Sequence, residues 1–331
     1  MASGEPIDRF GRRITYLRVS VTDRCNLRCG YCMPSEGIAQ RPHGEILRFE
    51  EIEAVVHAAG GQGIRAVRLT GGEPLVRAGI VDLVAALSGI PGIEEVAMTT
   101  NGTLLAAQAE RLAAAGLARV NISLDSLRPD RYDAITRRGR LEDALAGIDA
   151  AHRSGLSPVK VNAVVLRGVN DDEVVDLAVK TVTDAWHVRF IEPMPVGDDV
   201  LPGGARARLV PGDEIRARIE AALGTLDPVA GEGNGPARSY RLPGAAGTVG
   251  MITPVSRPFC STCNRLRLTA DGKLLGCLLV EGEIDVRTPL RRGAGSEDIA
   301  ELVRDAIRRK PLGHRLSKGA RNGRTMSQIG G

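Results

Sequence analysis

The chain has 331 residues, of which 43% are hydrophobic and 25% charged, as in soluble proteins with one large α/β domain or such a domain plus a small module. A net charge of +4 and a single Trp give little support for nucleic-acid binding. The first residues lack a signal-peptide core, and no stretch reaches the roughly 18–20 apolar residues of a membrane span. We therefore expect a cytoplasmic protein that binds neither nucleic acid nor a membrane.

Apolar strands alternate with amphipathic helices through the first 195 residues. We predict strands at 15–22, 64–70, 94–100, 119–125, 159–166 and 187–192, and helices near 49–60, 77–89, 103–115, 141–154 and 171–184. Repeated strand–helix pairs form a parallel sheet with crossover helices. The pattern predicts an α/β fold in which 1–195 is an incomplete (β/α)6-type TIM barrel.

The alternation breaks down after Pro193. The next twenty residues are rich in Pro and Gly and predict a long loop, which a helix at 213–223, several short strands and a helix at 296–309 follow. We expect 196–331 to form a C-terminal extension. On charge alone, its basic end (310–331) is typical of a solvated tail.

The two faces of the predicted strands differ. One phase is apolar, and the other carries four cations: Arg18, Arg68, Lys160 and Arg189. Side chains alternate across a strand, and helices cover the outside of a barrel, so the polar phase should face inward. Buried charge must be paired, so this lining predicts an anionic ligand. The alternative is that these strands are half exposed to water.

The six cysteines fall into two sets of three, and none lies outside them. The first set, with the spacing C-x3-C-x2-C, contains Cys25, Cys29 and Cys32. Iron–sulfur clusters usually take four thiolates, so three thiolates leave one iron open to a ligand. A zinc site completed by His43 is the minority alternative.

The second set, with the spacing C-x2-C-x13-C, contains Cys260, Cys263 and Cys277. A hairpin around Asp271-Gly272 would return Cys277 to the side of Cys263. No fourth cysteine remains, so this set also predicts an incomplete cluster.

Short motifs follow several strands at the end where barrel active sites are built. They are GGEP (71–74), TTNG (99–102) and SLD (123–125). Arg265 and Arg267 share one face of the predicted hairpin. Guanidinium groups there suit a phosphate or a purine edge.

Together these segments resemble the radical S-adenosylmethionine superfamily, and within it the GTP 3′,8-cyclase family of molybdenum cofactor biosynthesis. The similarity runs from about Tyr16 to Gly331 and rests on LRVSVTDRCNLRCGYCMP, RLTGGEPLVR, TTNG, NISLDSL, VKVNAVV, RFIEPMPVG, FCSTCNRLRLTADGKLLGCL and RTMSQIGG. It implies two 4Fe–4S clusters, S-adenosylmethionine, and conversion of GTP to (8S)-3′,8-cyclo-7,8-dihydroguanosine 5′-triphosphate by a 5′-deoxyadenosyl radical that takes hydrogen from C3′.

The resemblance also implies roles for individual residues. The first cysteine set would hold the cluster that chelates S-adenosylmethionine, and the second set the cluster that binds guanine. The expected cofactor-binding residues are Tyr31, Gly72, Glu73, Ser123, Asn162 and Met194. The expected substrate-binding residues are Arg18, Arg68, Thr99, Lys160, Arg189, Arg265 and Arg267. The residues expected at the reaction site are Arg265, Arg267, Gly330 and Gly331. For the C-terminal segment, this expectation replaces the prediction of a solvated tail.

Two departures and two rival functions remain. Ala66 stands where some relatives are expected to carry lysine, so one phosphate contact is missing or comes from elsewhere. Pro193 and Pro195 leave the position of Met194 open. The rivals are a peptide-modifying radical enzyme and a zinc-stabilised binding protein. Expected partners are GTP, an electron donor and the downstream enzyme that forms the cyclic pyranopterin, and a homodimer is compatible with the sequence.

Overall fold

The computed structural model describes residues 5–196, 201, 203–230, 235–280, 282–314 and 324–330. All six predicted strands are present, and each pairs in parallel with the next along the chain. They are β1 (Tyr16–Ser20), β2 (Ala66–Thr70), β3 (Glu95–Thr100), β4 (Arg119–Ser123), β5 (Lys160–Val164) and β6 (His187–Ile191). This parallel order confirms the predicted α/β class.

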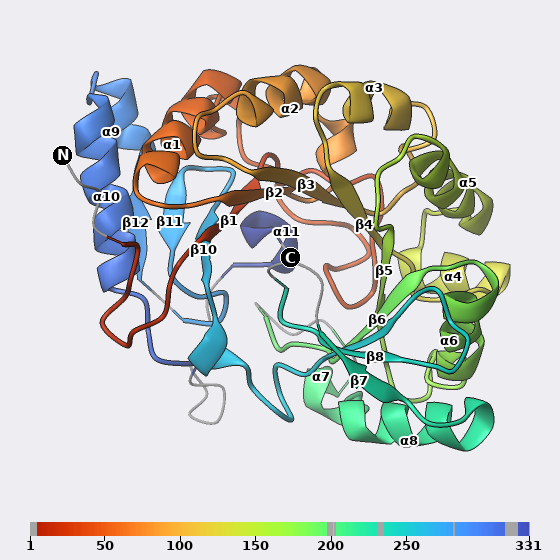
Figure 1. Ribbon diagram of the computed structural model, residues 1–331. Helices are drawn as coiled ribbons and strands as arrows, with labels where there is room; N and C mark the ends of the chain where they lie inside the picture. Colours follow the sequence, from red (N-terminus) through yellow and green to blue (C-terminus); the bar gives the residue numbers. More distant parts are fainter. Residues whose placement is uncertain are drawn as a thin grey trace.

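Helices lie outside this curved sheet, as Figure 1 shows. They are α1 (Phe49–Gly61), α2 (Ile80–Ser88), α3 (Ala109–Ala114), α4 (Pro129–Thr136), α5 (Leu141–Arg153) and α6 (Val174–Thr183). Helix α4 was not predicted, because its eight residues bury only Tyr132, Ile135 and Thr136 and show little apolar periodicity. Helix α2 begins later than predicted, after Gly79 in a left-handed conformation with φ +76°.

Two strands from the C-terminal part lengthen the parallel sheet on both sides. Strand β9 (Val249–Ile252) pairs with β6, and β10 (Arg265–Leu268) pairs with β1. The outer strands run antiparallel: β11 (Lys273–Leu275) and β12 (Glu283–Asp285) beyond β10, and β8 (Arg238–Arg241) and β7 (Asp227–Val229) beyond β9. The sheet ends at β12 and β7 without closing, which confirms an incomplete barrel. The domain division at 195 stays a prediction.

The remaining helices are α7 (Gly204–Ala207), α8 (Gly212–Leu223), α9 (Arg287–Arg291), α10 (Ser296–Arg308) and α11 (Met326–Ile329). Helices α8 and α10 match the two helices predicted in this part of the chain, whereas α7 lies within the predicted long loop. Helix α11 is different from the others, because it lies in the centre of the barrel near the C-terminus (Figure 1). No helix of the described ranges is long and apolar enough to cross a membrane.

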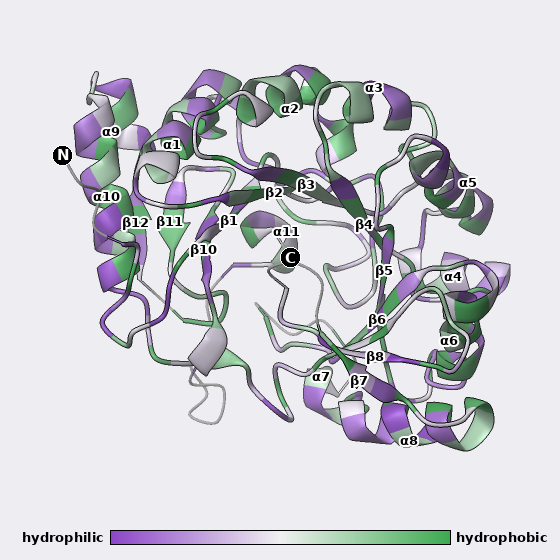
Figure 2. Cartoon of the chain, in the orientation of Figure 1, coloured by the Kyte–Doolittle hydropathy of each residue, from purple (hydrophilic) through white to green (hydrophobic). Residues whose placement is uncertain are grey.

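The hydrophobic core lies between the sheet and the outer helices. Residues of the apolar strand phase, such as Val19, Val67 and Val161, are fully buried. Figure 2 shows hydrophobic residues along these strands and hydrophilic residues mixed into outer helices such as α8 and α10. Because the apolar phase faces the helices, the polar phase of the same strands faces the barrel interior.

Candidate functional site

One cavity inside the barrel brings the two cysteine sets together. All six cysteines line it. So do most of the other predicted residues, which are Arg18, Tyr31, Arg68, Gly72, Glu73, Thr99, Ser123, Asn162, Arg189, Met194, Arg265 and Arg267. Lys160 is buried but does not line this cavity. Gly331 lies outside the described residues. The roles of these residues stay predictions, but their convergence defines a candidate active site.

The first cysteine set lies on the loop that follows β1. Burial raises the pKa of Cys25 and Cys29 and brings that of Cys32 to about 12. Thiols in this state keep their protons until a metal replaces them. The loop is held from outside by α4, because the Gly30 N–H donates to the Ile135 carbonyl at 2.9 Å. The three sulfur atoms therefore stand on an anchored loop.

The GGEP loop packs directly against the cysteine loop. The Gly72 N–H donates to the Thr22 carbonyl at 2.7 Å, and the Glu73 N–H donates to the Arg24 carbonyl at 2.8 Å. A Cβ atom at position 72 would lie 2.2 Å from the Arg24 carbonyl oxygen. Only glycine permits this approach, so Gly72 is needed where the two loops meet.

Glu73 is a buried carboxylate in the cavity. It accepts hydrogen bonds from the Thr100 hydroxyl at 2.6 Å, the Asn101 N–H at 2.7 Å and the Leu75 N–H at 3.1 Å. Burial raises its pKa to about 7, although these three donors favour the ionised form. A nearby cation, such as the ammonium group of an amino acid, would stabilise the ionised form of this carboxylate.

Asp125, just beyond β4, is a second buried acid and was predicted only as part of a motif. Its carboxylate accepts from the Tyr31 hydroxyl at 2.7 Å and from the Val164 N–H at 2.8 Å. Burial raises the pKa of Asp125 to about 6. The bond fixes Tyr31, which lies between Cys29 and Cys32 in the sequence, against the end of the central sheet. Nearby, Asn162 Oδ1 is buried without a hydrogen-bond partner among the described residues, as expected for an atom that faces a ligand.

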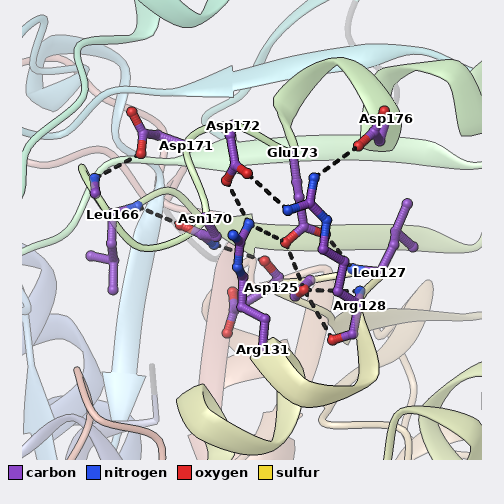
Figure 3. A network of polar contacts seen from close by, with 12 residues as sticks. Asp125, Leu127, Arg128, Arg131, Leu166, Asn170, Asp171, Asp172, Glu173 and Asp176 are labelled. Atoms are coloured by element: carbon purple, nitrogen blue, oxygen red, sulfur yellow. Dashed lines mark hydrogen bonds and ion pairs between the residues drawn. The ribbon is translucent and has the colours of Figure 1, made fainter.

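A buried polar network supports this end of β4 from behind (Figure 3). The Asn170 side-chain amide donates to the Asp125 carbonyl at 2.7 Å and to the Val164 carbonyl at 2.9 Å. Glu173, which is fully buried, accepts from the Leu127 N–H at 2.7 Å and forms an ion pair with Arg131 at 2.7 Å. The network therefore connects the loop before α6 to the strand end that carries Ser123 and Asp125.

Three arginines stand side by side across the barrel wall. The parallel registers place Arg18 opposite Arg68 on β2 and opposite Arg267 on β10. Burial lowers the pKa of all three, and neighbouring arginines lower it further: Arg267 comes to about 10 with help from Arg265, and Arg18 is lowered well below its usual range. Like charges packed this closely require an anion. The burial of Arg68 at 4% exposure excludes the half-exposed alternative for that strand.

The second cysteine set lies at the other end of the paired strands β1 and β10, because the first set follows β1 whereas Cys263 precedes β10, which runs parallel to β1. Strands β10 and β11 form the predicted hairpin, with Arg267 opposite Leu275. Cys277 follows β11, and Cys260 begins a 3-10 turn that ends just before Cys263 and β10. Burial raises the pKa of Cys263, but Arg265 and Lys310 lower it more, so that it comes to about 6. One thiol of this set is therefore already inclined to ionise near neutral pH.

Two buried cations behind this set were missed by the sequence analysis. The Lys310 ammonium donates to Cys263 Sγ at 3.3 Å, to the Arg265 carbonyl at 2.7 Å and to the Gly276 carbonyl at 2.6 Å. The Arg12 guanidinium donates to the Cys260 carbonyl at 2.7 Å. Both lie far from the cysteines in sequence, and Lys310 begins the segment that charge alone assigned to a solvated tail.

The C-terminal segment enters the cavity. Met326 and Ser327 of α11 line it, and Ile329 packs with Leu278 and Leu279. Gly330 has φ +68°, and a Cβ atom there would lie 2.0 Å from Thr70 Oγ1. The Arg267 guanidinium donates to the Gly330 carbonyl. The tail is therefore docked beside the arginine row, and only glycine fits at this point.

Glu192 joins the two parts of the chain at the end of β6 and was also missed. Its buried carboxylate accepts from the N–H groups of Gly212 at 3.1 Å, Val255 at 3.0 Å and Ser256 at 2.9 Å. Met194, two residues further, packs beside Leu278 and Leu279 and lines the cavity. Glu192 therefore anchors the segment whose prolines made it hard to place from sequence.

Across the described ranges, no three His, Cys, Asp or Glu side chains converge where one metal ion could be held. A 4Fe–4S cluster does not require such convergence, because each thiolate binds a different iron atom. The first cysteine set offers three sulfur ligands, and the Asn162 oxygen beside it has no hydrogen-bond partner among the described residues. This arrangement fits a cluster that also binds a small molecule.

Comparison with known proteins agrees with this geometry. One matching family model is described as the Radical SAM superfamily and covers residues 19–180, and another is described as Molybdenum Cofactor Synthesis C and covers residues 186–316. The chain is 55% identical over 325 residues to the GTP 3′,8-cyclase of Pelotomaculum thermopropionicum, covering 98% of this chain and 99% of that protein. It is 52% identical over 325 residues to the GTP 3′,8-cyclase of Moorella thermoacetica, with the same coverage.

Solved structures show a similar fold at low sequence identity. Streptococcus suis SuiB bound to precursor peptide SuiA gives a TM-score of 0.62 at 14% identity, covering 92% of this chain and 67% of that chain. SuiB bound to S-adenosylmethionine gives 0.59 at 14% identity, covering 82% of this chain, which spans 63% of the SuiB chain. These likenesses support the barrel fold alone.

Proposed function

The chain belongs to the GTP 3′,8-cyclase family of the radical S-adenosylmethionine superfamily, and on this basis we propose that it converts GTP to (8S)-3′,8-cyclo-7,8-dihydroguanosine 5′-triphosphate in molybdenum cofactor biosynthesis. The observation that carries the proposal is the single cavity in which two incomplete cysteine sets face a row of buried arginines. The cysteine sets fit iron–sulfur clusters, and the arginines fit a triphosphate.

Membership of the superfamily implies one 4Fe–4S cluster and S-adenosylmethionine, and we assign both to the wall formed by Cys25, Cys29 and Cys32. When bound, these cofactors supply the one-electron chemistry that removes hydrogen from an unactivated C–H bond. Glu73 accepts the ammonium group of S-adenosylmethionine, because the three groups that donate hydrogen bonds to its buried carboxylate are all uncharged. Asn162 offers its unpartnered oxygen to the same ligand.

GTP lies between the two cysteine sets. Arg18, Arg68 and Arg267 neutralise its phosphates, which relieves the mutual repulsion that lowers their pKa. Arg189 and Arg265 add to this lining. Ala66 offers no charge on the same face of β2, so the row relies on arginines from three strands.

We assign a second 4Fe–4S cluster to Cys260, Cys263 and Cys277, where its open iron would take the guanine. Guanine and the phosphates then lie at fixed, separate ends of the cavity, and this orients the ribose toward the first cysteine set. The docked α11 and the apolar contacts of Ile329 keep water from that side of the cavity. Arg267 has two roles: it lines the cavity, where the phosphates lie, and it donates a hydrogen bond to the Gly330 carbonyl of the C-terminal segment.

The test is anaerobic reconstitution followed by incubation with S-adenosylmethionine, dithionite and GTP. Mass spectrometry should find 5′-deoxyadenosine and a product isomeric with GTP. Deoxyadenosine without conversion of GTP would keep the radical chemistry but contradict the substrate. A colourless, zinc-loaded protein that makes neither product would contradict both.

A further inference from the structure

The buried Lys310 is held in an unusual place, directly behind the second cysteine set. Its residue is 2% exposed, and it lies just after α10 on a segment that closes the back of the β10–β11 hairpin. Lysine is almost never fully buried unless it is paired. A buried lysine at this position is therefore expected to have a negatively charged partner.

The surroundings of the Lys310 nitrogen match a charged ammonium group. The three acceptors around it are Cys263 Sγ at 3.3 Å, the Arg265 carbonyl at 2.7 Å and the Gly276 carbonyl at 2.6 Å. An ammonium has three N–H donors and no acceptor. Three acceptors thus match the three N–H donors of the protonated form.

These acceptors are spread over both cysteine-bearing ends of the hairpin. Cys263 precedes β10, and Gly276 precedes Cys277 beyond β11. By binding both ends, Lys310 holds two cysteines of the set at a fixed separation. A Cβ atom at position 276 would lie 2.9 Å from Lys310 Cα, so the hairpin and the lysine segment are packed without spare room.

Arg12 supplies a second cationic contact to the same set, with a different electrostatic character. It binds the carbonyls of Cys260 at 2.7 Å and Pro311 at 2.7 Å, and it forms an ion pair with Asp8 at 2.6 Å. Its charge is therefore compensated, and it contacts backbone rather than sulfur. Lys310 instead donates directly to a cysteine sulfur, and Arg265 is the other cation beside Cys263.

We propose that Lys310 is a positioning residue that assembles the ligands of the second cluster and, as a cation against the Cys263 sulfur, raises the reduction potential of that cluster. Potentials of iron–sulfur clusters depend on net charge and on hydrogen bonds to the sulfur atoms. A positive donor at a ligand sulfur stabilises the reduced, more negative cluster. The inference rests on the proposed second cluster.

The experiment uses the full-length chain with Cys25, Cys29 and Cys32 replaced by Ala, so that only the second set can hold iron. Iron and sulfide per chain are measured after anaerobic reconstitution, and the potential is measured by electron paramagnetic resonance during a redox titration. Neither readout requires enzymatic turnover.

Three substitutions are compared in that background: Lys310→Met, Arg12→Met and Lys273→Met. Lys273→Met is the matched control, because Lys273 lies on the same hairpin but pairs with Asp285 at 3.3 Å. For Lys310→Met we expect at least a twofold loss of iron and a more negative potential for the cluster that remains. Arg12→Met should lower iron retention but leave the potential unchanged, and Lys273→Met should change neither.

The outcomes separate this inference from the proposed function. A parent protein that binds no cluster would contradict the second cluster and the inference with it. A parent that binds about four irons, together with a Lys310→Met variant of equal iron content and equal potential, would overturn the inference alone. If Lys310→Met binds no iron, Lys310→Gln and Lys310→Arg serve as second variants. Lys310→Arg keeps a cation and should keep a potential near that of the parent. A normal potential in the uncharged Lys310→Gln variant would refute the electrostatic role.

Discussion

Glu73 gives the sharpest prediction for S-adenosylmethionine binding, because its burial sets a pH dependence. Its pKa is raised to about 7 by burial, and only the ionised carboxylate attracts an ammonium group. The apparent dissociation constant should therefore rise as the pH falls through 7. With a pKa of about 7, the carboxylate is about 90% ionised at pH 8 and about 10% ionised at pH 6, so binding should weaken by about tenfold between these values.

Glu73→Gln removes both the charge and its pH dependence. The loss of a hydrogen bond between charged groups costs about 1.5–3 kcal/mol, which corresponds to an increase in dissociation constant of about 10- to 150-fold at pH 8. The exposed Glu53→Gln on α1 serves as a control with the same chemical change.

The stability of the ligand-free protein distinguishes a binding defect from a folding defect. The folded pKa of Glu73 lies above the ordinary glutamate value of 4.5, so this carboxyl group lowers the free energy of unfolding as the pH rises from 4.5 to 7. At pH 8 its cost is about 3 kcal/mol. Gln removes that cost but places an amide donor against backbone N–H groups, which costs about 1–3 kcal/mol. The two terms nearly cancel, so the unfolding temperature at pH 8 should change little.

The assay is equilibrium binding of S-adenosylmethionine to the cluster-loaded protein under anaerobic conditions at pH 6, 7 and 8. A wild-type affinity that is the same at pH 6 and pH 8 would contradict the role of Glu73. A Glu73→Gln variant that keeps the wild-type pH dependence would also contradict it, because another group would then carry that dependence.

Three further predictions concern residues that support the cavity. Glu192→Ala leaves three backbone N–H groups without their acceptor and should lower the free energy of unfolding by about 3–5 kcal/mol. Replacement of the exposed Glu53 by Ala should change it by less than about 0.5 kcal/mol. Denaturant titration measures both free energies. Gly330→Ala places a Cβ atom against Thr70 and should reduce turnover about 100-fold with iron content unchanged. Gly155→Ala is the control, because Gly155 has a similar φ of +73° but open space around it, and this variant should keep full turnover. Glu173→Ala breaks the network behind β4 and should weaken S-adenosylmethionine binding at least threefold without loss of iron; equal affinity would show that the network does not position the site.

The strands of the barrel could be predicted because their two faces differ in polarity. Arg18 and Arg68 alternate with buried valines, so the period of two identified both the strands and their inward face. Strands β9 and β10 were harder, since β9 has four residues and the arginines of β10 suit an isolated hairpin equally well. Their parallel pairing with β6 and β1 depends on tertiary contacts that local sequence does not encode.

The same distinction applies to the site. The spacing of the cysteines and the position of GGEP after a strand are local patterns that can be recognised in the sequence. Lys310 and Arg12 could not be recognised in this way, because their partners lie 47 and 248 residues away. Arg267 was predicted as a substrate ligand, but its place beside Arg18 follows only from the β1–β10 register. Long-range pairing decides which charges share a cavity, and a single sequence gives little information about it.

The most direct test of the proposed reaction is the fate of the hydrogen at C3′ of GTP. The reconstituted protein is incubated with S-adenosylmethionine, dithionite and GTP that carries deuterium at C3′. We predict that deuterium appears in 5′-deoxyadenosine and is lost from the nucleotide product. Deuterium that stays in the nucleotide while unlabelled 5′-deoxyadenosine accumulates would contradict the assignment of GTP as the substrate.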